Sequence, residues 1–295
     1  MNILGTGLSG LVGSRIMELL SPSMTFKNLS LETGVDITNK KDVDAYFAES
    51  SADWVFHLAA YTDVQGAEKE KEHQKESTAW KVNVLATEYI VDNCRLHKKK
   101  LLYIDTDYAF DGKSGPYDED SIPNPQCWYA KTKTEGAKRV LSLGKDGLVV
   151  RISNPYRAHP VGKKDFVHKM LERFSQGLSI SAPNDSLFVP TFIDDLAIAV
   201  ERMVTVNAYG IYHVVGSEAL SPYQASLQIA HIFNCDSSLV KETTFGEMFT
   251  DRAPAPQLAN LTQEKIKNLG VHPHTFEEGL IEVKSQESSA NERKL

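Results

Sequence analysis

The stretch MNILGTGLSGLVG, residues 1–13, decides the fold of this chain. Its first six residues predict a short buried strand, and a helix with apolar residues at helical spacing follows through Leu20. Between them Gly7, Gly10 and Gly13 form a G-x-x-G-x-x-G run. Glycine permits the tight turn and lets the backbone approach a phosphate group, while the helix N-terminus offers free N–H groups. A flexible turn with close helix packing is the alternative, but the placement at a first strand–helix turn favours an anionic dinucleotide.

The alternation of short apolar runs and amphipathic helices continues over the first half of the chain. Apolar runs at Trp54–Ala60, Leu101–Asp105 and Leu148–Ile152 predict strands, and the stretch Thr78–His97 predicts a helix. Repeated strand–helix units indicate an α/β fold, a doubly wound parallel sheet of the Rossmann type with helices on both faces. We therefore expect residues 1–152 to form a domain that binds NAD(P).

The chain changes character after residue 152, where prolines divide it into shorter elements. We expect a smaller C-terminal substrate lobe formed by residues 153–187 and 216–283, with residues 188–215 returning to the first domain. The last stretch, residues 284–295 (KSQESSANERKL), is almost free of apolar residues and predicts a mobile tail.

Composition and charge exclude several classes of protein. Hydrophobic residues make up 41% of the 295 residues and charged ones 24%, which is typical of a globular protein without membrane spans or widespread disorder. The net charge of -7 gives little attraction to a phosphate backbone, so we expect no nucleic-acid partner. The 3 cysteines are odd in number and widely spaced, which argues against a disulfide framework or a zinc site. The sequence opens directly on a strand instead of a signal segment, and the cysteines suit a reducing compartment, so we expect a cytoplasmic protein with no membrane partner. We also expect no metal.

A tyrosine and a lysine four residues apart carry the candidate chemistry. Tyr129 and Lys133 lie on one face of a predicted helix, and Thr106 follows the predicted strand Leu101–Asp105. The Lys133 ammonium favours phenolate, so we expect it to lower the pKa of Tyr129 and also to bind the nicotinamide ribose. In reduction, a cofactor hydride reaches a carbonyl carbon, Tyr129 protonates the oxygen and Thr106 polarises it. A structural tyrosine beside a snorkelling lysine is the alternative, because such pairs are common on ordinary helices.

Together these motifs resemble the short-chain dehydrogenases/reductases, in which the glycine run and Y-x-x-x-K occur in this order. Gly34–Thr38 is similar to the segment of that superfamily that meets the adenine ring, and His57–Thr62 to the strand end that lines the cofactor. The resemblance implies a cofactor site formed by Gly7, Gly10, Leu11, Val12, Gly13, Asp36, Ile37, Ala59, Ala60, Tyr61, Thr62, Tyr129 and Lys133. Asp36 is also a candidate N-cap for a helix that begins at Lys40.

The choice between NADH and NADPH depends on the end of the second predicted strand, near Thr25–Asn28. No acidic residue follows it closely enough to hold a ribose 2′-hydroxyl, since Glu32 is too distant. Lys27 or Arg15 could meet a 2′-phosphate, but both equally fit exposed surface charges. We therefore expect NADPH or NADH, with a slight preference for NADPH.

Longer segments resemble one family within that superfamily, the dTDP-4-dehydrorhamnose reductases. Asp105–Gly112 (DTDYAFDG) is similar to the family's S-T-D-Y-V-F-D-G segment, and Ala59–Glu68 to its A-A-Y-T-x-V-D-x-A-E segment. Further matches are Pro190–Ala197, Gly210–His213 and Arg252–Leu261, so the resemblance covers the chain except its tail. It implies an NAD(P)H-dependent reductase of a 4-keto nucleotide sugar, most closely dTDP-4-dehydro-6-deoxy-L-mannose, in dTDP-L-rhamnose synthesis.

The family's functional residues carry over to this chain with two departures. The resemblance implies catalytic roles for Thr106, Tyr129 and Lys133, and substrate contacts from Thr106, Asp107, Tyr129 and Asn154. Asp105 stands where the family usually has serine, and Pro155 stands where it has a tryptophan that lines the sugar pocket. The stretch Ile152–Pro160 (ISNPYRAHP) is closer to nucleotide-sugar epimerases, which leaves the identity of the sugar open.

The sequence leaves other functions open. A dehydratase of this superfamily carries Asp-Glu after its threonine, but here Asp107 is followed by Tyr108, which argues against dehydration. An epimerase, which retains its cofactor through a keto intermediate, stays open. A non-catalytic regulatory subunit also stays open, because the beta subunit of methionine adenosyltransferase is similar to these reductases and binds NADP. The complete set of catalytic residues weakly disfavours a regulatory role. The sequence also leaves open whether the protein forms a homodimer.

Overall fold

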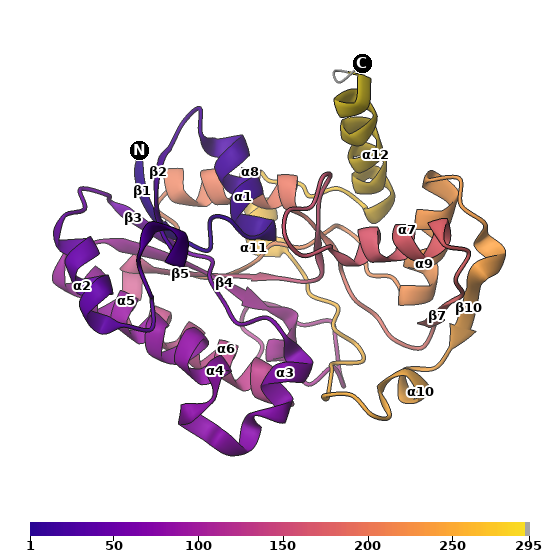
Figure 1. Cartoon of the computed structure of the whole chain (residues 1–295), viewed down its shortest axis with the longest axis horizontal. Helices are drawn as coiled ribbons and strands as arrows, with labels where there is room; N and C mark the ends of the chain where they lie inside the picture. The colour runs from indigo at the N-terminus through magenta and orange to yellow at the C-terminus, as the bar shows by residue number, and fades with distance from the viewer. Residues whose placement is uncertain (293–295) are drawn as a thin grey trace.

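A parallel sheet of six strands forms the larger part of the structure (Figure 1). The computed structural model describes residues 1–292. The strand order is β2-β1-β3-β4-β5-β9, and all neighbouring strands run parallel. The strands are β1 (Asn2–Thr6), β2 (Thr25–Leu29), β3 (Trp54–His57), β4 (Lys100–Thr106), β5 (Gly147–Ile152) and β9 (Gly210–His213). The predicted doubly wound α/β fold is confirmed.

Helices cover both faces of this sheet, because its strands carry apolar side chains on both sides. Leu102 and Val150 share a core with α1 (Leu11–Leu20) and α8 (Ile193–Thr205). Tyr103 and Val149, on the opposite face, share a second core with α2 (Lys40–Ala48), α5 (Ala86–Leu96) and α6 (Trp128–Leu141). Figure 1 shows the two groups of helices on opposite sides of the sheet.

The helix expected over Thr78–His97 runs continuously from α4 (Thr78–Trp80) through the π-helical turn η3 (Lys81–Leu85) into α5, with helical backbone at each junction. Two short pieces precede it, α3 (Val64–Lys69) and the 3-10 turn η2 (Lys71–Glu76). The 3-10 turns elsewhere in this domain are η1 (Leu31–Thr33), η4 (Asp107–Ala109) and η5 (Gly144–Asp146). Trp80 stacks on Trp128, with 5.9 Å between ring centroids. This contact holds the start of that helix against α6, the helix that carries Tyr129.

The smaller lobe has a core of aromatic rings. Its two small parallel sheets pair β6 (Pro155–Tyr156) with β8 (Thr191–Phe192), and β7 (Ile180–Pro183) with β10 (Val240–Thr243). Its helices are α7 (Phe166–Ser175), α9 (Pro222–Ile232), η6 (Ser237–Leu239), α10 (Phe245–Phe249) and α12 (Phe276–Glu292). Tyr156 packs on Phe192 and Phe276, with ring centroids 5.5 and 5.2 Å away. Burial of these rings stabilises the lobe, since two-stranded sheets are marginal by themselves.

The chain returns from the lobe to the sheet domain in two places. The segment 188–215 contributes α8 and β9 to that domain. Residues 264–271, which we expected in the lobe, also pack against the sheet domain. α11 (Glu264–Asn268) packs on β9, and Ile266 and Val271 are buried in the same core as α8. Two apolar side chains make this contact. A sequence pattern of only two residues is too weak to predict where the segment packs. None of the helices within residues 1–292 is long and apolar enough to cross a membrane.

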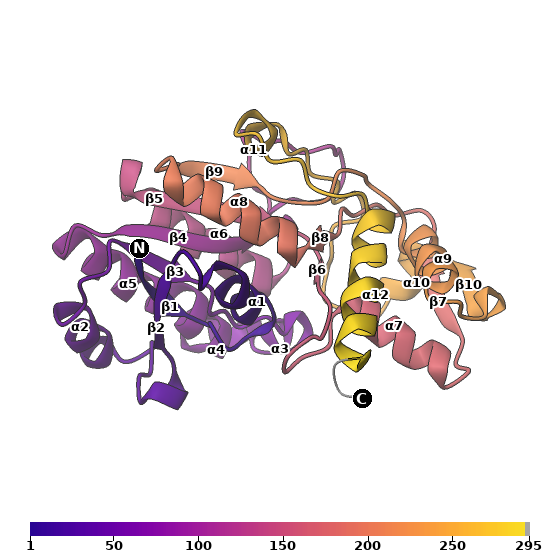
Figure 2. The same cartoon turned by 90° about the horizontal axis from the view of Figure 1, so that it is seen from above.

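A helix takes the place of the expected mobile tail. α12 runs from Phe276 to Glu292, and Figure 2 shows it between the sheet domain and helices α7 and α9 of the lobe. Gln286 accepts a hydrogen bond from Arg15 of α1 (2.7 Å) and donates one to Asp194 of α8 (2.9 Å). Polar partners on other helices therefore hold a segment whose own composition predicts mobility. For residues 293–295 the expected tail lies outside the described residues.

Replacing Arg15 tests this polar junction. Its guanidinium donates to both carboxylate oxygens of Asp194, at 2.7 and 2.6 Å, and is almost fully buried. Arg15→Met leaves the Asp194 carboxylate without its cation, so we expect the free energy of unfolding to fall by about 2 kcal/mol in chemical denaturation. Arg95→Met removes the exposed pair with Asp92 and should cost less than about 0.5 kcal/mol. Equal losses in the two variants would contradict a specific role for Arg15.

Candidate active site

The glycine loop brings β1, α1 and β3 into close contact. Gly7 has a φ of +68°, and a Cβ atom added to it would lie 2.5 Å from the backbone nitrogen of Ala59. A Cβ atom added to Gly13 would lie 2.2 Å from the Gly7 carbonyl oxygen. Gly10 is the N-cap of α1 and provides no capping side chain, and the first turn of the helix contains no acidic residue. The free N–H groups and the dipole of this turn therefore fit an anionic group such as a pyrophosphate.

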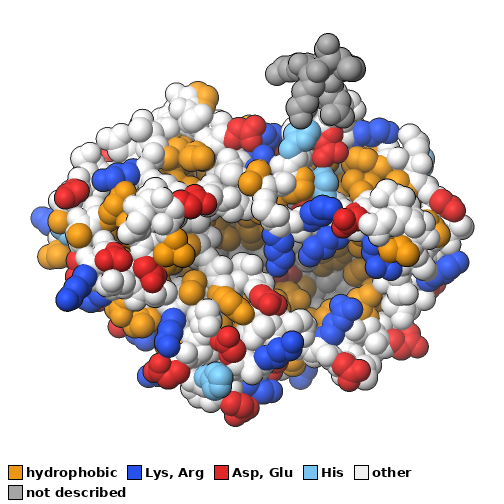
Figure 3. Space-filling view, in the orientation of Figure 1, with side chains coloured by type: hydrophobic (Ala, Val, Ile, Leu, Met, Phe, Trp, Pro, Cys, Tyr) orange, Lys and Arg blue, Asp and Glu red, His pale blue; other side chains and the backbone are white. Residues whose placement is uncertain are grey.

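A cavity of about 700 Å³ lies at the carboxyl ends of β1, β3, β4 and β5. Its walls contain most of the residues predicted from the sequence, namely Gly7, Gly10, Leu11, Val12, Gly13, Ala59, Ala60, Thr62, Thr106, Asp107, Tyr129, Lys133 and Asn154. Figure 3 shows a hollow between the sheet domain and the lobe, with basic side chains along its edge. Residues far apart in the sequence meet here because the ends of parallel strands share one edge of the sheet.

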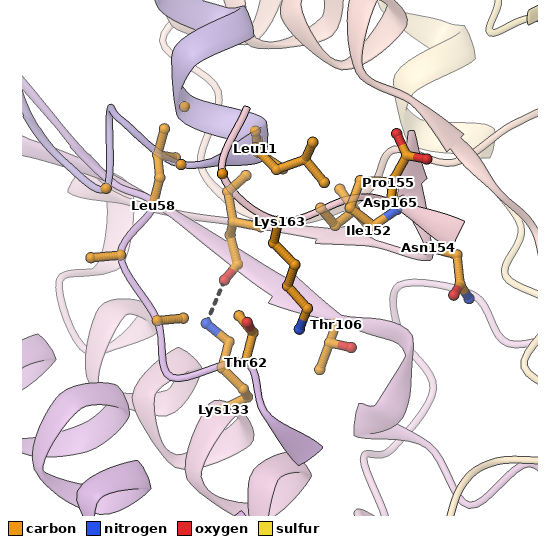
Figure 4. A pocket seen from close by; sticks show the side chains of 18 of the residues that line it. Leu11, Leu58, Thr62, Thr106, Lys133, Ile152, Asn154, Pro155, Lys163 and Asp165 are labelled. Carbon is orange, nitrogen blue, oxygen red and sulfur yellow. Dashed lines mark hydrogen bonds between the residues drawn. The ribbon is translucent and has the colours of Figure 1, made fainter. Parts of the chain in front are cut away.

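Lys133 and Tyr129 reach the cavity from α6. The Lys133 Nζ donates a hydrogen bond to the Ile104 carbonyl oxygen (2.7 Å) and lies 3.9 Å from the centroid of the Tyr103 ring. Figure 4 shows this hydrogen bond and the neighbouring Thr106. Burial lowers the pKa of Lys133 to about 8, although the negative charge of Asp105 opposes this. Strand β4 and helix α6 thus bring the lysine, the tyrosine and the threonine hydroxyl to one wall.

The lobe adds basic residues that sequence analysis missed. The loop that precedes α7 places Lys163 and Lys164 on the cavity, and α7 itself adds Lys169. Figure 4 shows Lys163 extended across the cavity toward Thr106. Lys164 is paired with Glu172 at 2.7 Å. Exposed lysines form no local pattern, so these residues are identified only by the fold, which places the lobe over the strand ends.

Comparison with known proteins identifies the family. The family described as RmlD substrate binding domain matches residues 1–288. A dTDP-4-dehydrorhamnose reductase from Aggregatibacter actinomycetemcomitans is 32% identical over 77% of this chain and 77% of its own length. The chain belongs to this reductase family.

A solved relative agrees with the fold over almost the whole chain, and a further relative matches part of the sequence. The solved dTDP-4-dehydrorhamnose reductase from Bacillus anthracis, in complex with NADP, is 27% identical with a TM-score of 0.85, covering 97% of this chain and 99% of that one. Methionine adenosyltransferase 2 subunit beta from Xenopus tropicalis is 29% identical over 68% of this chain and 62% of its own length.

The pKa of Tyr129 is shifted in the direction opposite to the one predicted from the sequence. The phenol is buried, and burial raises its pKa above the ordinary value. The hydrogen bond with Thr106 works in the opposite direction, while the nearby carboxylates of Asp105 and Asp107 raise the pKa further. The predicted lowering of this pKa was wrong, because desolvation of the buried phenol is the largest influence on it.

Asp107 accepts hydrogen bonds from two hydroxyl groups at the cavity. Its Oδ1 accepts a hydrogen bond from the Thr106 hydroxyl (3.0 Å), and its Oδ2 accepts one from the Ser153 hydroxyl (2.6 Å). Burial raises the pKa of Asp107 to about 6 despite these two hydrogen bonds. Ser153 was not predicted, although it follows β5, the strand paired with β4, and could have been found from that position. Asp107 thus orients the Thr106 hydroxyl, and its own contact with a substrate stays a prediction.

Asp36, Ile37 and Tyr61 do not line the cavity. Asp36 is exposed, and its Oδ1 accepts hydrogen bonds from the N–H and the hydroxyl of Thr38, at 2.9 and 2.7 Å. It stabilises a turn, while Asn39 takes the predicted N-cap position of α2. Cofactor contacts from these residues stay predictions.

Asn83 was missed by sequence analysis and links the segment that follows β3 to α6. Its side chain accepts a hydrogen bond from the Tyr61 N–H (2.8 Å) and donates one to the Thr132 hydroxyl of α6 (3.0 Å). The residue is buried in the π-helical turn η3. An asparagine within a predicted helix gives no sign of such a link, because its partners are distant in the sequence.

Neither basic residue considered for a 2′-phosphate faces the cavity. Arg15 is buried and paired with Asp194. Both predictions for this residue, an exposed surface charge and a phosphate ligand, were therefore wrong. The Lys27 Nζ lies 4.3 Å from the centroid of the Tyr46 ring. The slight preference for NADPH therefore gains no support from Arg15.

Asp107→Asn tests the pKa of this buried carboxyl. A pKa raised in the folded state makes a contribution to stability that is complete below the unfolded value of 3.8 and is lost as the pH rises through about 6. The free energy of unfolding of the variant relative to the original chain should thus increase by about 2 kcal/mol between pH 4 and pH 7 in denaturant titrations. Asp111→Asn should show the opposite trend, since hydrogen bonds from Tyr117 and the Lys113 N–H lower the pKa of Asp111. A pH-independent difference for Asp107→Asn would contradict the raised pKa.

Proposed function

We propose that this protein is an NAD(P)H-dependent reductase that converts the 4-keto group of a nucleotide sugar to an alcohol. The observation that carries this proposal is the meeting of Thr106, Tyr129 and Lys133 with the glycine loop on one cavity, in a member of the dTDP-4-dehydrorhamnose reductase family. The family indicates dTDP-4-dehydro-6-deoxy-L-mannose as the first substrate to test. Pro155 borders the cavity beside Asn154 and makes related keto sugars the next candidates.

The cavity has the donors that a dinucleotide requires. The first turn of α1 offers uncapped N–H groups for a pyrophosphate, and the glycines allow close backbone approach. Lys133 gives one N–H to Ile104 and retains two donors for the hydroxyls of a ribose. When bound, the reduced nicotinamide supplies the hydride for the carbonyl carbon. The relative solved with NADP adds support for NADPH, and NADH is retained as the alternative.

Tyr129 is suited to donate a proton to the carbonyl oxygen. Because burial raises the pKa of its phenol, the side chain holds its proton at neutral pH. Transfer of that proton to the developing alkoxide leaves a phenolate, which the positive charge of Lys133 stabilises. The Thr106 hydroxyl, oriented by Asp107, donates a hydrogen bond to the same carbonyl oxygen when it turns from the carboxylate to the substrate. Each of the three residues therefore has a separate task in reduction.

The lobe lysines fit the diphosphate of a nucleotide sugar. Lys163 and Lys169 are exposed on the cavity opposite the catalytic wall, and phosphate oxygens accept charge-assisted hydrogen bonds from ammonium groups. Lys164 is engaged with Glu172 and is less available. These contacts would fix the nucleotide while the sugar extends toward Thr106 and Tyr129.

A regulatory, non-catalytic role is the second candidate. The similarity to methionine adenosyltransferase 2 subunit beta favours it, but it covers only 62% of that protein's length. The intact catalytic set and its arrangement on one cavity favour the reductase. An epimerase would differ by consuming no reduced cofactor overall. The cytoplasmic location and the homodimer stay predictions.

Tyr129→Phe removes the proton donor and retains the ring. We expect turnover, measured as loss of reduced-nicotinamide absorbance with NADPH and with NADH, to fall by about a factor of 100 or more. Cofactor affinity, measured by fluorescence titration, should change less than about threefold because the ring still fills its place. Tyr46→Phe on α2 is the matched control and should keep full activity. Substantial turnover by Tyr129→Phe would overturn the role of this tyrosine.

Lys163→Met with Lys169→Met tests the diphosphate contact. The double variant should raise the KM for the nucleotide sugar about tenfold, because two phosphate contacts are lost, and should leave kcat within about threefold. Lys164→Met is the control from the same loop and should raise KM less, since its ammonium is already paired with Glu172. An unchanged KM in the double variant would place the diphosphate elsewhere.

A further inference from the structure

Asp105, one of the two departures from the family pattern, forms a buried ion pair. It lies directly opposite Arg151 in the parallel register of β4 and β5. The Arg151 Nε donates to the Asp105 Oδ2 at 3.2 Å, and the two side chains are 2% and 0% exposed. Separating the two charges would leave each of them buried without compensation, which is strongly unfavourable. Arg151 therefore holds the Asp105 carboxylate in a fixed position.

A histidine holds the arginine from the other side. The Nδ1 of His213 lies 3.0 Å from the Thr262 carbonyl oxygen, which only accepts, so this nitrogen carries the proton. The Nε2 of His213 is then an acceptor for the Arg151 Nη1 at 3.3 Å. Burial and the charge of Arg151 lower the pKa of His213 to about 3, in agreement with a neutral ring. Arg151 is therefore directed toward Asp105 by a neutral partner that does not compete for its charge.

The ion pair with Arg151 engages only one of the two carboxylate oxygens of Asp105. Within residues 1–292 the buried Oδ1 has no hydrogen-bond partner, and Asp105 belongs to the cavity wall. Because side chains alternate along a strand, Asp105 shares its face of β4 with Tyr103, on the side covered by α6. The Lys133 Nζ of α6 lies over the Tyr103 ring and binds the carbonyl of Ile104, the residue before Asp105. Asp105 and the ammonium of Lys133 thus lie on the same face of β4.

We propose that Asp105 is a positioning residue whose carboxylate, anchored by Arg151 and His213, keeps Lys133 in its ammonium form beside Tyr129. The serine found at this position in the family pattern has no charge and cannot do this. The effect on the charge of Lys133 is independent of the substrate, whereas its consequence for turnover rests on the proposed reductase function.

The surroundings of Lys133 make a nearby negative charge important. Burial lowers the pKa of Lys133 to about 8, and Asp105 is the charge that opposes this change. The titratable or charged groups around Lys133 come from β3, β4, η4, α6 and the lobe loop, and they are His57, Tyr103, Asp105, Asp107, Tyr129 and Lys163. His57 is neutral because burial lowers its pKa to about 3, and burial raises the pKa of both tyrosines. Asp105 therefore provides the negative charge that acts on Lys133, from the face of β4 that Lys133 covers.

The direct test is the pKa of Lys133 in the full-length protein without added cofactor. The Cε resonance of Lys133 in protein labelled with ¹³C-lysine, assigned by its loss in Lys133→Met, is followed against pH. We expect Asp105→Asn to lower the pKa of Lys133 by about 1 unit, because an amide of the same shape removes the charge. Glu119→Gln is the control, since Glu119 is buried and accepts a hydrogen bond from the His213 N–H but is not part of the cavity wall. An unchanged pKa in Asp105→Asn would overturn the proposal.

A second variant covers the case in which Asp105→Asn does not fold. Asp105→Asn combined with Arg151→Gln removes both charges of the buried pair, so no buried arginine is left unpaired. We expect the pKa of Lys133 to fall in this variant as well. A pKa equal to that of the original chain would overturn the proposal, because the negative charge of Asp105 is then not what stabilises the ammonium.

Turnover separates this inference from the proposed function. If the protein is a keto-sugar reductase, Asp105→Asn should move the alkaline limb of the kcat profile to lower pH by about 1 unit, with KM for the sugar within about twofold. A residue with only a structural role would lower the melting temperature without moving that limb, and that result would overturn the positioning role. If no keto sugar is turned over by the original chain, the reductase proposal fails, and the Lys133 titration alone decides the inference.

Discussion

The parallel register of β1, β3, β4 and β5 is the constraint on which the rest of the structure depends. Backbone hydrogen bonds hold Thr6 opposite His57, and Thr106 opposite Ile152, so the residues that follow these strands emerge at one edge. The glycine loop, Ala59, Thr106 and Asn154 meet there although they are widely separated along the chain. The fit depends on backbone contact, since a single Cβ atom at Gly7 would collide with the chain at Ala59. The cavity is therefore a consequence of strand pairing, and the side chains only give it its chemistry.

Burial determines what those side chains can do. The same desolvation keeps a proton on Tyr129, weakens the hold of Lys133 on its proton and raises the pKa of Asp107. These changes suit reduction, in which the protein must deliver a proton at neutral pH and then accommodate the charge that remains. The buried carboxylates are accordingly fixed by partners: Asp107 by two hydroxyls and Asp105 by Arg151.

The lobe is joined to the sheet domain through polar contacts made largely by α1, the helix that begins at the glycine loop. Arg157 of the lobe donates to Ser14 (2.9 Å) and Glu18 (3.0 Å), and Arg15 contacts Gln286 of α12. Glu287 of α12 pairs with His168 of α7, the residue directly before Lys169. The helix that would receive a pyrophosphate thus also fixes the placement of the basic residues proposed to receive the sugar nucleotide. The proposed cofactor site and the proposed substrate site are therefore both supported by α1.

The sequence by itself determined the alternating α/β architecture, the glycine loop, and the positions of Thr106, Tyr129 and Lys133. Each of these depends on local spacing: a strand followed by glycines and a helix, a hydroxyl at a strand end, and two residues one helical turn apart. Only the tertiary structure decided the direction of the Tyr129 pKa change, the contacts of Ser153 and Asn83, the placement of Lys163 on the cavity, and the helical state of most of the expected tail. Likewise, Arg15 and Asp105 are ordinary charged residues in the sequence, and their partners Asp194 and Arg151 lie 179 and 46 residues away. Charges and buried polar groups act through neighbours brought together by folding, so their chemistry cannot be obtained from local pattern.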